Sequence, residues 1–346
     1  MSTPEVSLQQ LTSLLLSKDM SSLKQGCELA EALCTKEATF RELLELLGSL
    51  DKGSYLHLWS LGVLSRWDPS IIENTTELFF NDEACSEIPS CIKEFKNLNS
   101  FGIYKESAPL TIPNWLGELT TLETLEIDIY KSPCSTLPES IGNLVHLKEF
   151  SLSSEFIAFL PDSMGNLTNL QILKIDCNHD EPQLTNLPST LRRLSNLRTL
   201  KWVGAEYAIL GDWIGGLRKL SYLNLQNNGI PQLPDNFGNL TNLYQLNLVD
   251  NSLSVLPESF LKLKSLSTLD VCNNDGLSLP EGIGALENLL SLNIEGTYQG
   301  DLPESFYNLK NLTTLYASAD DLSDETRKLI KERLPDCSIC TYWSDF

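Results

Sequence analysis

Leucines recur in a strict pattern between residues 217 and 315. The centre of the pattern is an apolar–polar–apolar triplet, and successive triplets begin at one constant interval, at Leu223, Leu246, Leu269, Leu292 and Leu315. A unit this short cannot bury its leucines alone, but stacked copies bury them against one another. The period therefore predicts a solenoid and not a core built around a catalytic site.

The same register continues towards the N-terminus in less regular units. Their triplets begin at Leu78, Phe101, Leu125, Phe150, Leu173 and Leu200, which makes eleven units in all. One extra residue precedes the Leu125 triplet, two precede Phe150 and four precede Leu200. Because the strand leucines are intact on both sides, we expect the surplus to form loops near 130–136 and 179–186.

The two ends of the chain break the period. From 7 to 66, apolar residues such as Leu11, Leu14 and Leu15 recur at helical spacing, which predicts three or four short helices that shield the first strand. Residues 322–333 predict a helix with Ser323 as N-cap, and 339–342 a last parallel strand. The predicted boundaries are 1–75 for a helical N-terminal cap, 76–319 for the repeats and 320–346 for a C-terminal cap.

Within one unit, alternate leucines should point inward along a short strand, and the residues between them should face outward. Asn178, Asn228, Asn251 and Asn274 follow their strands at the turn, where a buried amide can bond the backbone of two units. Other units lack this asparagine, so we expect a continuous ladder only late in the array. Glycines such as Gly142 and Gly238 should permit a tight turn on the convex side.

Two stretches carry a family resemblance: residues 137–144 read LPESIGNL and residues 279–286 read LPEGIGAL. With the triplets they give the consensus LPxxIGxLxxLxxLxLxxNxL, and 76–319 thereby resembles the 23-residue class of leucine-rich repeat proteins, as in Ras-group scaffold proteins and bacterial intracellular proteins. The resemblance implies an α/β fold class: a right-handed β-α superhelix with a parallel concave sheet of about 11–12 strands. It also implies that the chain binds other proteins.

The net charge of the chain restricts the classes of molecule that it can bind. The chain has 46 acidic and 25 basic residues, a formal net charge of −21. Such a surface repels phosphate backbones and anionic membranes, so we expect no nucleic-acid or membrane partner. The same charge would attract a basic or mixed protein surface, and the alternative interpretation is that it serves only solubility. Nine scattered cysteines, with no secretory signal and no apolar stretch of membrane-spanning length, favour a cytoplasmic protein with reduced thiols. We expect a monomer.

Candidate chemistry is sparse. Cys337 and Cys340 form a CxxC that lacks the helix start of a redox motif and the second cysteine pair of a zinc site. The three histidines lie far from any nucleophile motif, and His179, in the longest insertion, fits a solvated loop better than a cation site. We therefore predict no catalytic residues, no cofactor and no metal.

The outward positions of the strands remain as the candidate partner-binding site. They are Tyr104, Glu126, Asp128, Glu149, Lys174, Asp176, Lys201, Tyr222, Asn224, Asn247, Asp270, Asn293, Glu295 and Tyr316. We expect Glu149 and Asp176 to neutralise the two lysines.

The predicted function is a non-enzymatic scaffold or adaptor that binds a protein partner on its concave face. The alternative is the recognition module of a secreted effector or signalling protein that acts on host proteins. An enzyme with a catalytic cysteine in an appended domain is disfavoured, because the segment after Ala319 is too short to form such a domain.

Overall fold

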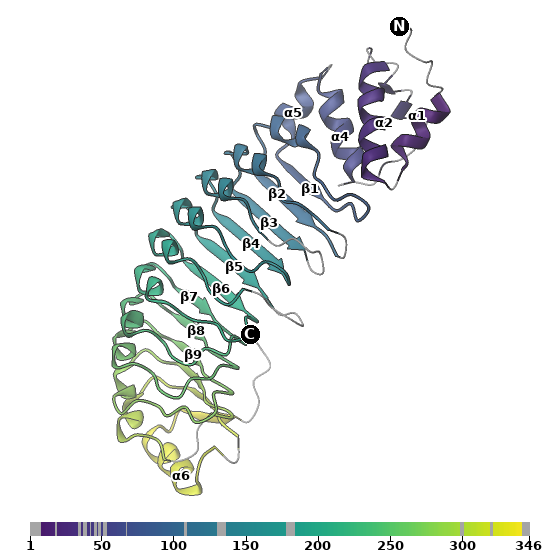
Figure 1. The fold of residues 1–346 in the computed structure, drawn as a ribbon. Coiled ribbons are helices and arrows are strands. Elements are labelled where there is room, and N and C mark those ends of the chain that lie inside the picture. The colour runs from purple at the N-terminus through teal and green to yellow at the C-terminus, as the bar shows by residue number, and fades with distance from the viewer. Residues whose placement is uncertain are drawn as a thin grey trace.

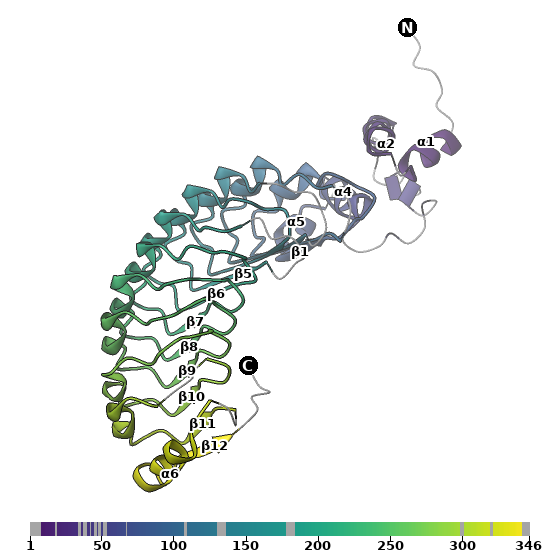
Figure 2. The same cartoon turned by 60° about the horizontal axis from the view of Figure 1, so that its bottom comes forward.

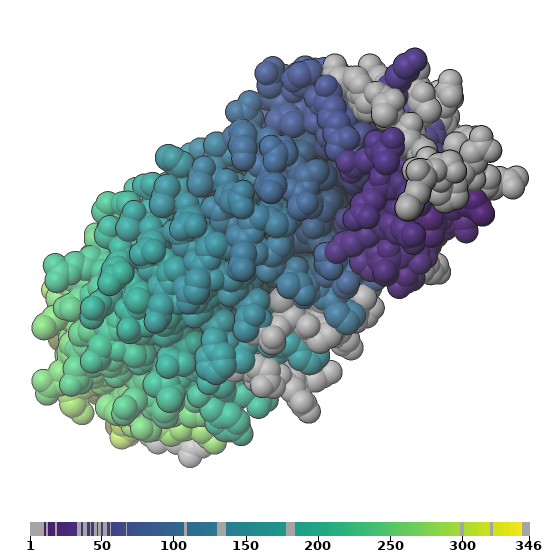
Figure 3. Space-filling model, turned by 45° about the horizontal axis from the view of Figure 1, so that its top comes forward, coloured from purple at the N-terminus to yellow at the C-terminus, as the bar shows by residue number. Residues whose placement is uncertain are grey.

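The computed structural model describes residues 8–340 except 18, 34–35, 37–39, 42, 45–46, 48–49, 51–53, 67, 107–108, 130–135, 178–183, 298–300 and 319–320. The described residues form a curved solenoid with helices at its N-terminal end (Figure 1). Strands line the inner side of the curve and short helices line the outer side (Figure 2). The space-filling view follows the same order along one face, from the purple N-terminal helices to the green repeats (Figure 3).

The inner side is one parallel sheet whose twelve strands lie in chain order. The strands are β1 (Glu77–Phe80), β2 (Ser100–Tyr104), β3 (Thr124–Ile129), β4 (Glu149–Ser154), β5 (Ile172–Asp176), β6 (Thr199–Val203), β7 (Tyr222–Asn224), β8 (Gln245–Asn247), β9 (Thr268–Asp270), β10 (Ser291–Asn293), β11 (Thr314–Tyr316) and β12 (Ser338–Cys340). The predicted fold class and strand number are confirmed.

The strand register confirms the predicted units. Leu223 pairs with Leu246, and Leu246 with Leu269, at the expected regular interval. The strand pairs β2–β3, β3–β4 and β5–β6 keep the same in-register pairing across the three enlarged intervals. The surplus residues thus leave the hydrogen-bonded pairing of the strands intact. The loops predicted to hold them fall mainly at 130–135 and 178–183, so that these loops, with Asn178 and His179, lie outside the described residues.

The inward leucines form one continuous core that extends from Leu11 in the first helix to Cys337 beside the last strand. Leu223, Leu246 and Leu269 are completely buried. Each unit therefore covers the apolar side of its neighbours, as the stacking argument requires.

The outer side of each unit is a short 3-10 helix. These are η1 (Ser90–Glu94), η2 (Asn114–Glu118), η3 (Glu139–Asn143), η4 (Asp162–Asn166), η5 (Ser189–Arg193), η6 (Asp212–Gly216), η7 (Asp235–Asn239), η8 (Glu258–Lys262), η9 (Ile283–Ala285) and η10 (Glu304–Asn308). Most begin directly after the proline of Leu-Pro, which stands at the N-cap position with an extended backbone.

The convex glycines serve close packing and not an unusual backbone angle. Gly142 and Gly238 are absent from the residues with positive φ. A Cβ on Gly238 would lie 2.0 Å from the Ser259 carbonyl oxygen, and one on Gly142 would lie 2.5 Å from that of Ser163. The expected tight turn is thus a close approach between neighbouring units.

The N-terminal helices are α1 (Leu8–Leu15), α2 (Met20–Leu33), α4 (Tyr55–Leu64) and α5 (Ser70–Asn74). The sequence pattern missed α5, a single turn that follows Pro69. Phe40 and Trp59 make an edge-to-face contact at 5.3 Å inside this group. The expected short helices are present and share the core of the first units, whereas the domain boundaries at 75 and 319 stay a prediction.

The other end is closed by α6 (Asp324–Arg333) and β12. The Ser323 hydroxyl accepts a hydrogen bond from the Thr326 N–H at 3.1 Å, which confirms the predicted N-cap. β12 pairs in parallel with β11 and so extends the sheet beyond the last repeat.

The asparagine ladder is confirmed over three consecutive units. The Asn251 side chain accepts a bond from the Ile230 N–H at 2.9 Å and donates to the carbonyls of Leu225 and Leu248, both at 2.9 Å. Asn228 and Asn274, both completely buried, make the corresponding contacts one unit away on each side.

In an early unit a lysine makes comparable bonds. Lys105 is only 2% exposed, and its ammonium donates to the carbonyls of Asp82 and Cys85. Burial lowers the pKa of this group. The sequence pattern did not indicate that a cation would be buried here.

Replacing Asn251 by alanine should destabilise the protein by about 2–4 kcal/mol, because several buried backbone groups lose their partners. Asn242→Ala is the matched control, since Asn242 is exposed and its amide donates a hydrogen bond to the Arg218 carbonyl, and the change should cost about 0.5–1 kcal/mol. Urea denaturation followed by circular dichroism measures both. Equal costs would show that the ladder contributes no more than a surface hydrogen bond.

Candidate binding surface on the concave sheet

The strand register arranges the outward residues in rows across the sheet. One row runs through Glu126, Ser151, Lys174, Lys201 and Asn224, which are partners in successive strand pairs. Side chains on neighbouring strands lie about 5 Å apart, so they form one surface.

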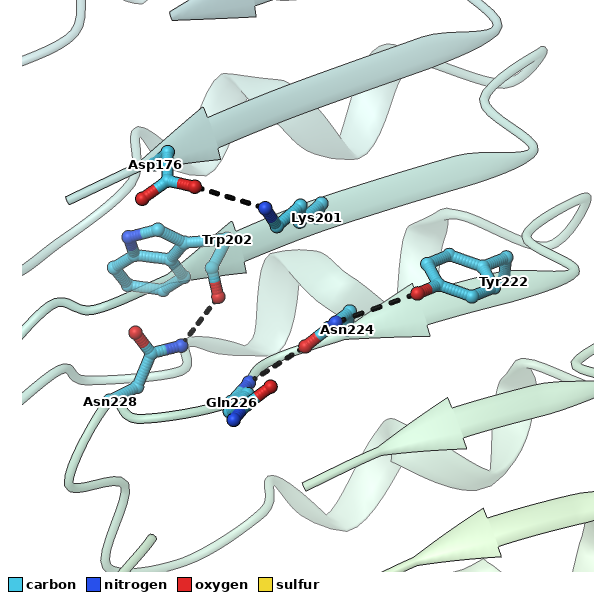
Figure 4. A network of polar contacts seen from close by, with 7 residues as sticks. All are labelled: Asp176, Lys201, Trp202, Tyr222, Asn224, Gln226 and Asn228. Carbon is cyan, nitrogen blue, oxygen red and sulfur yellow. Dashed lines mark hydrogen bonds and ion pairs between the residues drawn. The ribbon is translucent and has the colours of Figure 1, made fainter. Parts of the chain in front are cut away.

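Two diagonal ion pairs hold the centre of this surface. The Lys174 ammonium lies 2.7 Å from a Glu149 carboxylate oxygen, and the Lys201 ammonium lies 2.9 Å from Asp176. Figure 4 shows the second pair, with Lys201 on the strand that also carries the buried Trp202. The expected neutralisation of both lysines is confirmed. Since all four side chains stay partly exposed, these pairs add little stability but fix the positions of the charges.

The N-terminal part of the surface is acidic. The Tyr104 hydroxyl donates to Glu126 at 2.7 Å, and burial together with this carboxylate raises the pKa of Tyr104 to about 12. No described residue pairs with the Asp128 carboxylate. The candidate residues on β2 and β3 thus carry uncompensated negative charge.

Four of the candidate side chains are not exposed, which corrects the expectation that they face solvent. Asn224 is 7% exposed, Asp270 3%, and Asn247 and Asn293 2% each. Each accepts a hydrogen bond from the backbone N–H two residues further along, at 2.9–3.0 Å, as Asn224 does from Gln226 (Figure 4). Short Asn and Asp side chains fold back onto their own backbone in this way. They shape the sheet and offer little to a partner.

These four residues also mark a change in strand length. β7 to β10, which carry them, have three residues each, whereas β2 to β6 have five or six. β2 to β6 hold Gly, Glu, Ser or Lys at the equivalent position. In β7 to β10 the side chain takes the next N–H, so that this donor is lost to the strand ladder, whereas β11 is equally short with Tyr316 at this position. The signal was present in the sequence as Asn or Asp inside four successive triplets.

Asp270 is the one carboxylate in this buried row. Its oxygens accept from the Cys272 N–H at 3.0 Å and from the Asn293 amide at 3.2 Å. Burial nevertheless raises the pKa of Asp270 to about 6, and the Asp250 and Glu295 carboxylates act in the same direction.

Three further candidates lie towards the C-terminal half. Tyr222 is partly exposed, and its hydroxyl lies 3.5 Å from the Asn224 amide (Figure 4). Glu295 and Tyr316 are also partly exposed, on or beside β10 and β11. The exposed candidates therefore concentrate on β2 to β7.

Six of the described thiols are poorly suited to nucleophilic chemistry. Burial raises the pKa of Cys27, Cys85, Cys91, Cys177 and Cys272 to about 12 and that of Cys337 to about 11, all six being unpaired. A thiol is reactive as the thiolate, which these environments disfavour. Within the described part of the chain, no three His, Cys, Asp or Glu side chains gather as a metal site. None of the helices described there has the length and apolarity needed to cross a bilayer.

Two surface hollows lie away from the concave sheet. One, of about 500 Å³, is lined by residues that precede the strands, among them Glu123, Lys148 and Arg198. The other, of about 420 Å³, lies on the side where the strands end and includes Phe159 and Asp162. The concave surface itself is a broad sheet with fixed side chains, which suits a macromolecular partner better than a metabolite.

Comparison with known proteins supports this description. No protein-family model matches the chain. A protein of Arabidopsis thaliana, named as a candidate disease resistance protein, is 31% identical over 106 residues. That match covers 31% of this chain but only 12% of the Arabidopsis protein.

Several solved structures have a similar fold. An internalin of Listeria monocytogenes, inlF, is 18% identical with a TM-score of 0.56, over 90% of this chain and 86% of its own. The receptor TLR13, solved in complex with ssRNA13, is 20% identical with a TM-score of 0.64, over 85% and 42%. FLRT2, in an octameric complex with Latrophilin 3 and Unc5D, is 19% identical with a TM-score of 0.58, over 78% and 84%.

The periodic leucine repeats, the twelve-stranded parallel sheet and these likenesses show that the chain has the leucine-rich repeat solenoid fold. At such low identity the solved structures establish the fold and leave the partner open.

Changing Asp270 to Asn should stabilise the protein by about 1–2 kcal/mol at pH 8, because a desolvated charge disappears while one bond from Asn293 is lost. The folded pKa lies above the ordinary value of about 3.9, so ionised Asp270 destabilises the fold above about pH 6, and the penalty fades as pH falls towards 4. The gain should therefore shrink between pH 8 and pH 4.5 in urea titrations.

Exposed Asp275, changed to Asn, is the control for loss of a charge on the same unit. A difference between wild type and Asp270→Asn that stays constant with pH would contradict the assignment of the effect to this carboxyl.

Proposed function

We propose that the protein is a non-enzymatic scaffold that binds a protein partner on the concave surface of β2 to β7. The observation that carries the proposal is the set of fixed charged and polar side chains on that surface, namely Tyr104 with Glu126, Glu149 with Lys174, and Asp176 with Lys201. Because these side chains are already held in place, association costs little conformational entropy.

The charge of the chain favours a protein over a nucleic acid. TLR13 is a fold relative that was solved with RNA, but a formal charge of −21 makes a phosphate backbone an unfavourable partner here. The carboxylates of exposed Glu126 and partly exposed Asp128 instead complement basic side chains on a protein. We further propose that the chain acts as a monomer in the cytoplasm, in line with its free thiols.

The alternative, a recognition module of a secreted effector or signalling protein, would use the same surface. This alternative differs from the scaffold in the location of the protein partner, and the side chains that would contact the partner are the same.

The test is affinity purification from a native lysate with Lys174→Glu and Lys201→Glu combined. Both changes set a negative charge against an existing carboxylate, and exposed ion pairs of this kind contribute about 1 kcal/mol or less to stability, so the chain should stay folded. Arg193→Glu with Lys262→Glu, on the convex helices η5 and η8, gives the same change in charge.

Quantitative mass spectrometry should show proteins that the wild type and the convex variant recover equally and the concave variant recovers at least five-fold less. Recovery that falls equally in both variants, or in neither, would contradict the concave site.

A further inference from the structure

Large apolar side chains line the flank that connects the strand ends with the convex helices. Phe159 is 74% exposed, Ile209 65% and Val255 60%. Each immediately precedes the buried leucine that leads into η4, η6 or η8. We refer to Phe159, Ile209 and Val255, with Tyr207 beside Ile209, as the flank stripe.

The backbone of this flank is extended and parallel between units. Thr136 bridges to Phe159, Asn186 to Ile209, and Val255 to Ser278. In such a segment alternate side chains point to opposite sides, so that Leu160 is buried while Phe159 faces out. The exposure of Phe159, Ile209 and Val255 is therefore set by the strand register of this segment and does not result from a disordered surface side chain.

Tyr207 adds a backbone observation. It is 81% exposed and has a positive φ of 57°, whereas the other described non-glycine residues in that region are Asn or Asp. Asn and Asp tolerate this conformation, but a bulky aromatic residue does not favour it. A strained and exposed tyrosine at the edge of the stripe points to a role in contact.

A row of carboxylates runs beside the stripe. Three positions after Phe159, Ile209 and Val255 stand the carboxylates Asp162, Asp212 and Glu258. Asp235 stands at the equivalent position in the unit between Ile209 and Val255. All four are exposed, and no cation among the described residues pairs with them. The hollow of about 420 Å³ joins the two features, since Phe159, Asp162 and Glu139 all line it.

We propose that the flank stripe is a second docking site, separate from the concave surface, for a cationic amphipathic helix of a protein partner. Neighbouring units are about 4.8 Å apart. Phe159, Ile209 and Val255 each lie two units from the next, so that an apolar side chain recurs about every 10 Å along the stripe. Residues seven apart on a helix recur at about 10.5 Å and present one apolar side chain to each. Lysines or arginines on the neighbouring helix positions would then face the carboxylate row.

The test uses the full chain and a designed peptide of about 18 residues with leucine on one face of a helix and lysine on the other. Such a helix is about 27 Å long, enough to span the units from Phe159 to Val255. A scrambled peptide of the same composition controls for attraction to the net charge, and a Leu/Glu peptide reverses the sign. Binding is followed by fluorescence anisotropy at two salt concentrations.

The wild type should bind the Leu/Lys helix at least ten-fold more tightly than either control peptide. Phe159→Ser, Ile209→Ser and Val255→Ser combined should weaken binding at least ten-fold and still fold, because Asn186 and Gln232 already place polar side chains in this row. The control Tyr244→Ser with Leu290→Ser, at exposed apolar positions outside the stripe, should bind as the wild type does. Asp162→Asn with Asp212→Asn should weaken binding and lower its salt dependence.

The Tyr207→Gly variant distinguishes a role of Tyr207 in peptide binding from a role in stabilising the fold. It relieves the positive φ, so stability should be kept or raised while peptide affinity falls. Equal affinity for the scrambled peptide, or no loss in the serine variant, would overturn the proposal. So would sedimentation showing a wild-type dimer that the serine variant makes monomeric, because a second copy would then be the occupant.

Discussion

The whole structure depends on the alignment of each strand with the same position of the next unit. A single unit has no stable core of its own, and its leucines are buried only because the neighbouring leucines stand directly beside them. Parallel pairing fixes that alignment on the concave side, and the glycine contacts fix the spacing on the convex side. The helices at the N-terminus and α6 at the C-terminus cover the two units that would otherwise expose an apolar end.

Alignment also determines what each surface can do. Residues at one position of the repeat form a row, so a single type of side chain repeated along the sequence becomes a surface property. On β7 to β10 the row of Asn and Asp side chains is buried and bonded to its own backbone. On β4 to β6 acidic side chains and lysines form ion pairs on an exposed, charged surface. The two halves of the concave sheet therefore differ in what they offer a partner although they share one backbone.

Much of this could be read from the sequence because the deciding forces are periodic. The strand centres, the enlarged intervals before Leu125, Phe150 and Leu200, the Ser323 cap and the Asn251 ladder all follow from side-chain spacing. The four buried Asx residues were misjudged because alternation alone predicts outward direction and not accessibility. The burial of Lys105 and the strain at Tyr207 depend on contacts with other units and on local backbone angles, which no periodic rule contains.

The enlarged intervals have a consequence for how the fold accepts added residues. Strand pairs that enclose extra residues keep the same ladder as the regular pairs, so added residues are accommodated without repacking the leucines. The solenoid can thus acquire or lose whole segments at selected units while its scaffold stays constant. Insertions between strands can therefore change the surface that the solenoid presents while the leucine core keeps its pairing, because connecting segments tolerate added residues.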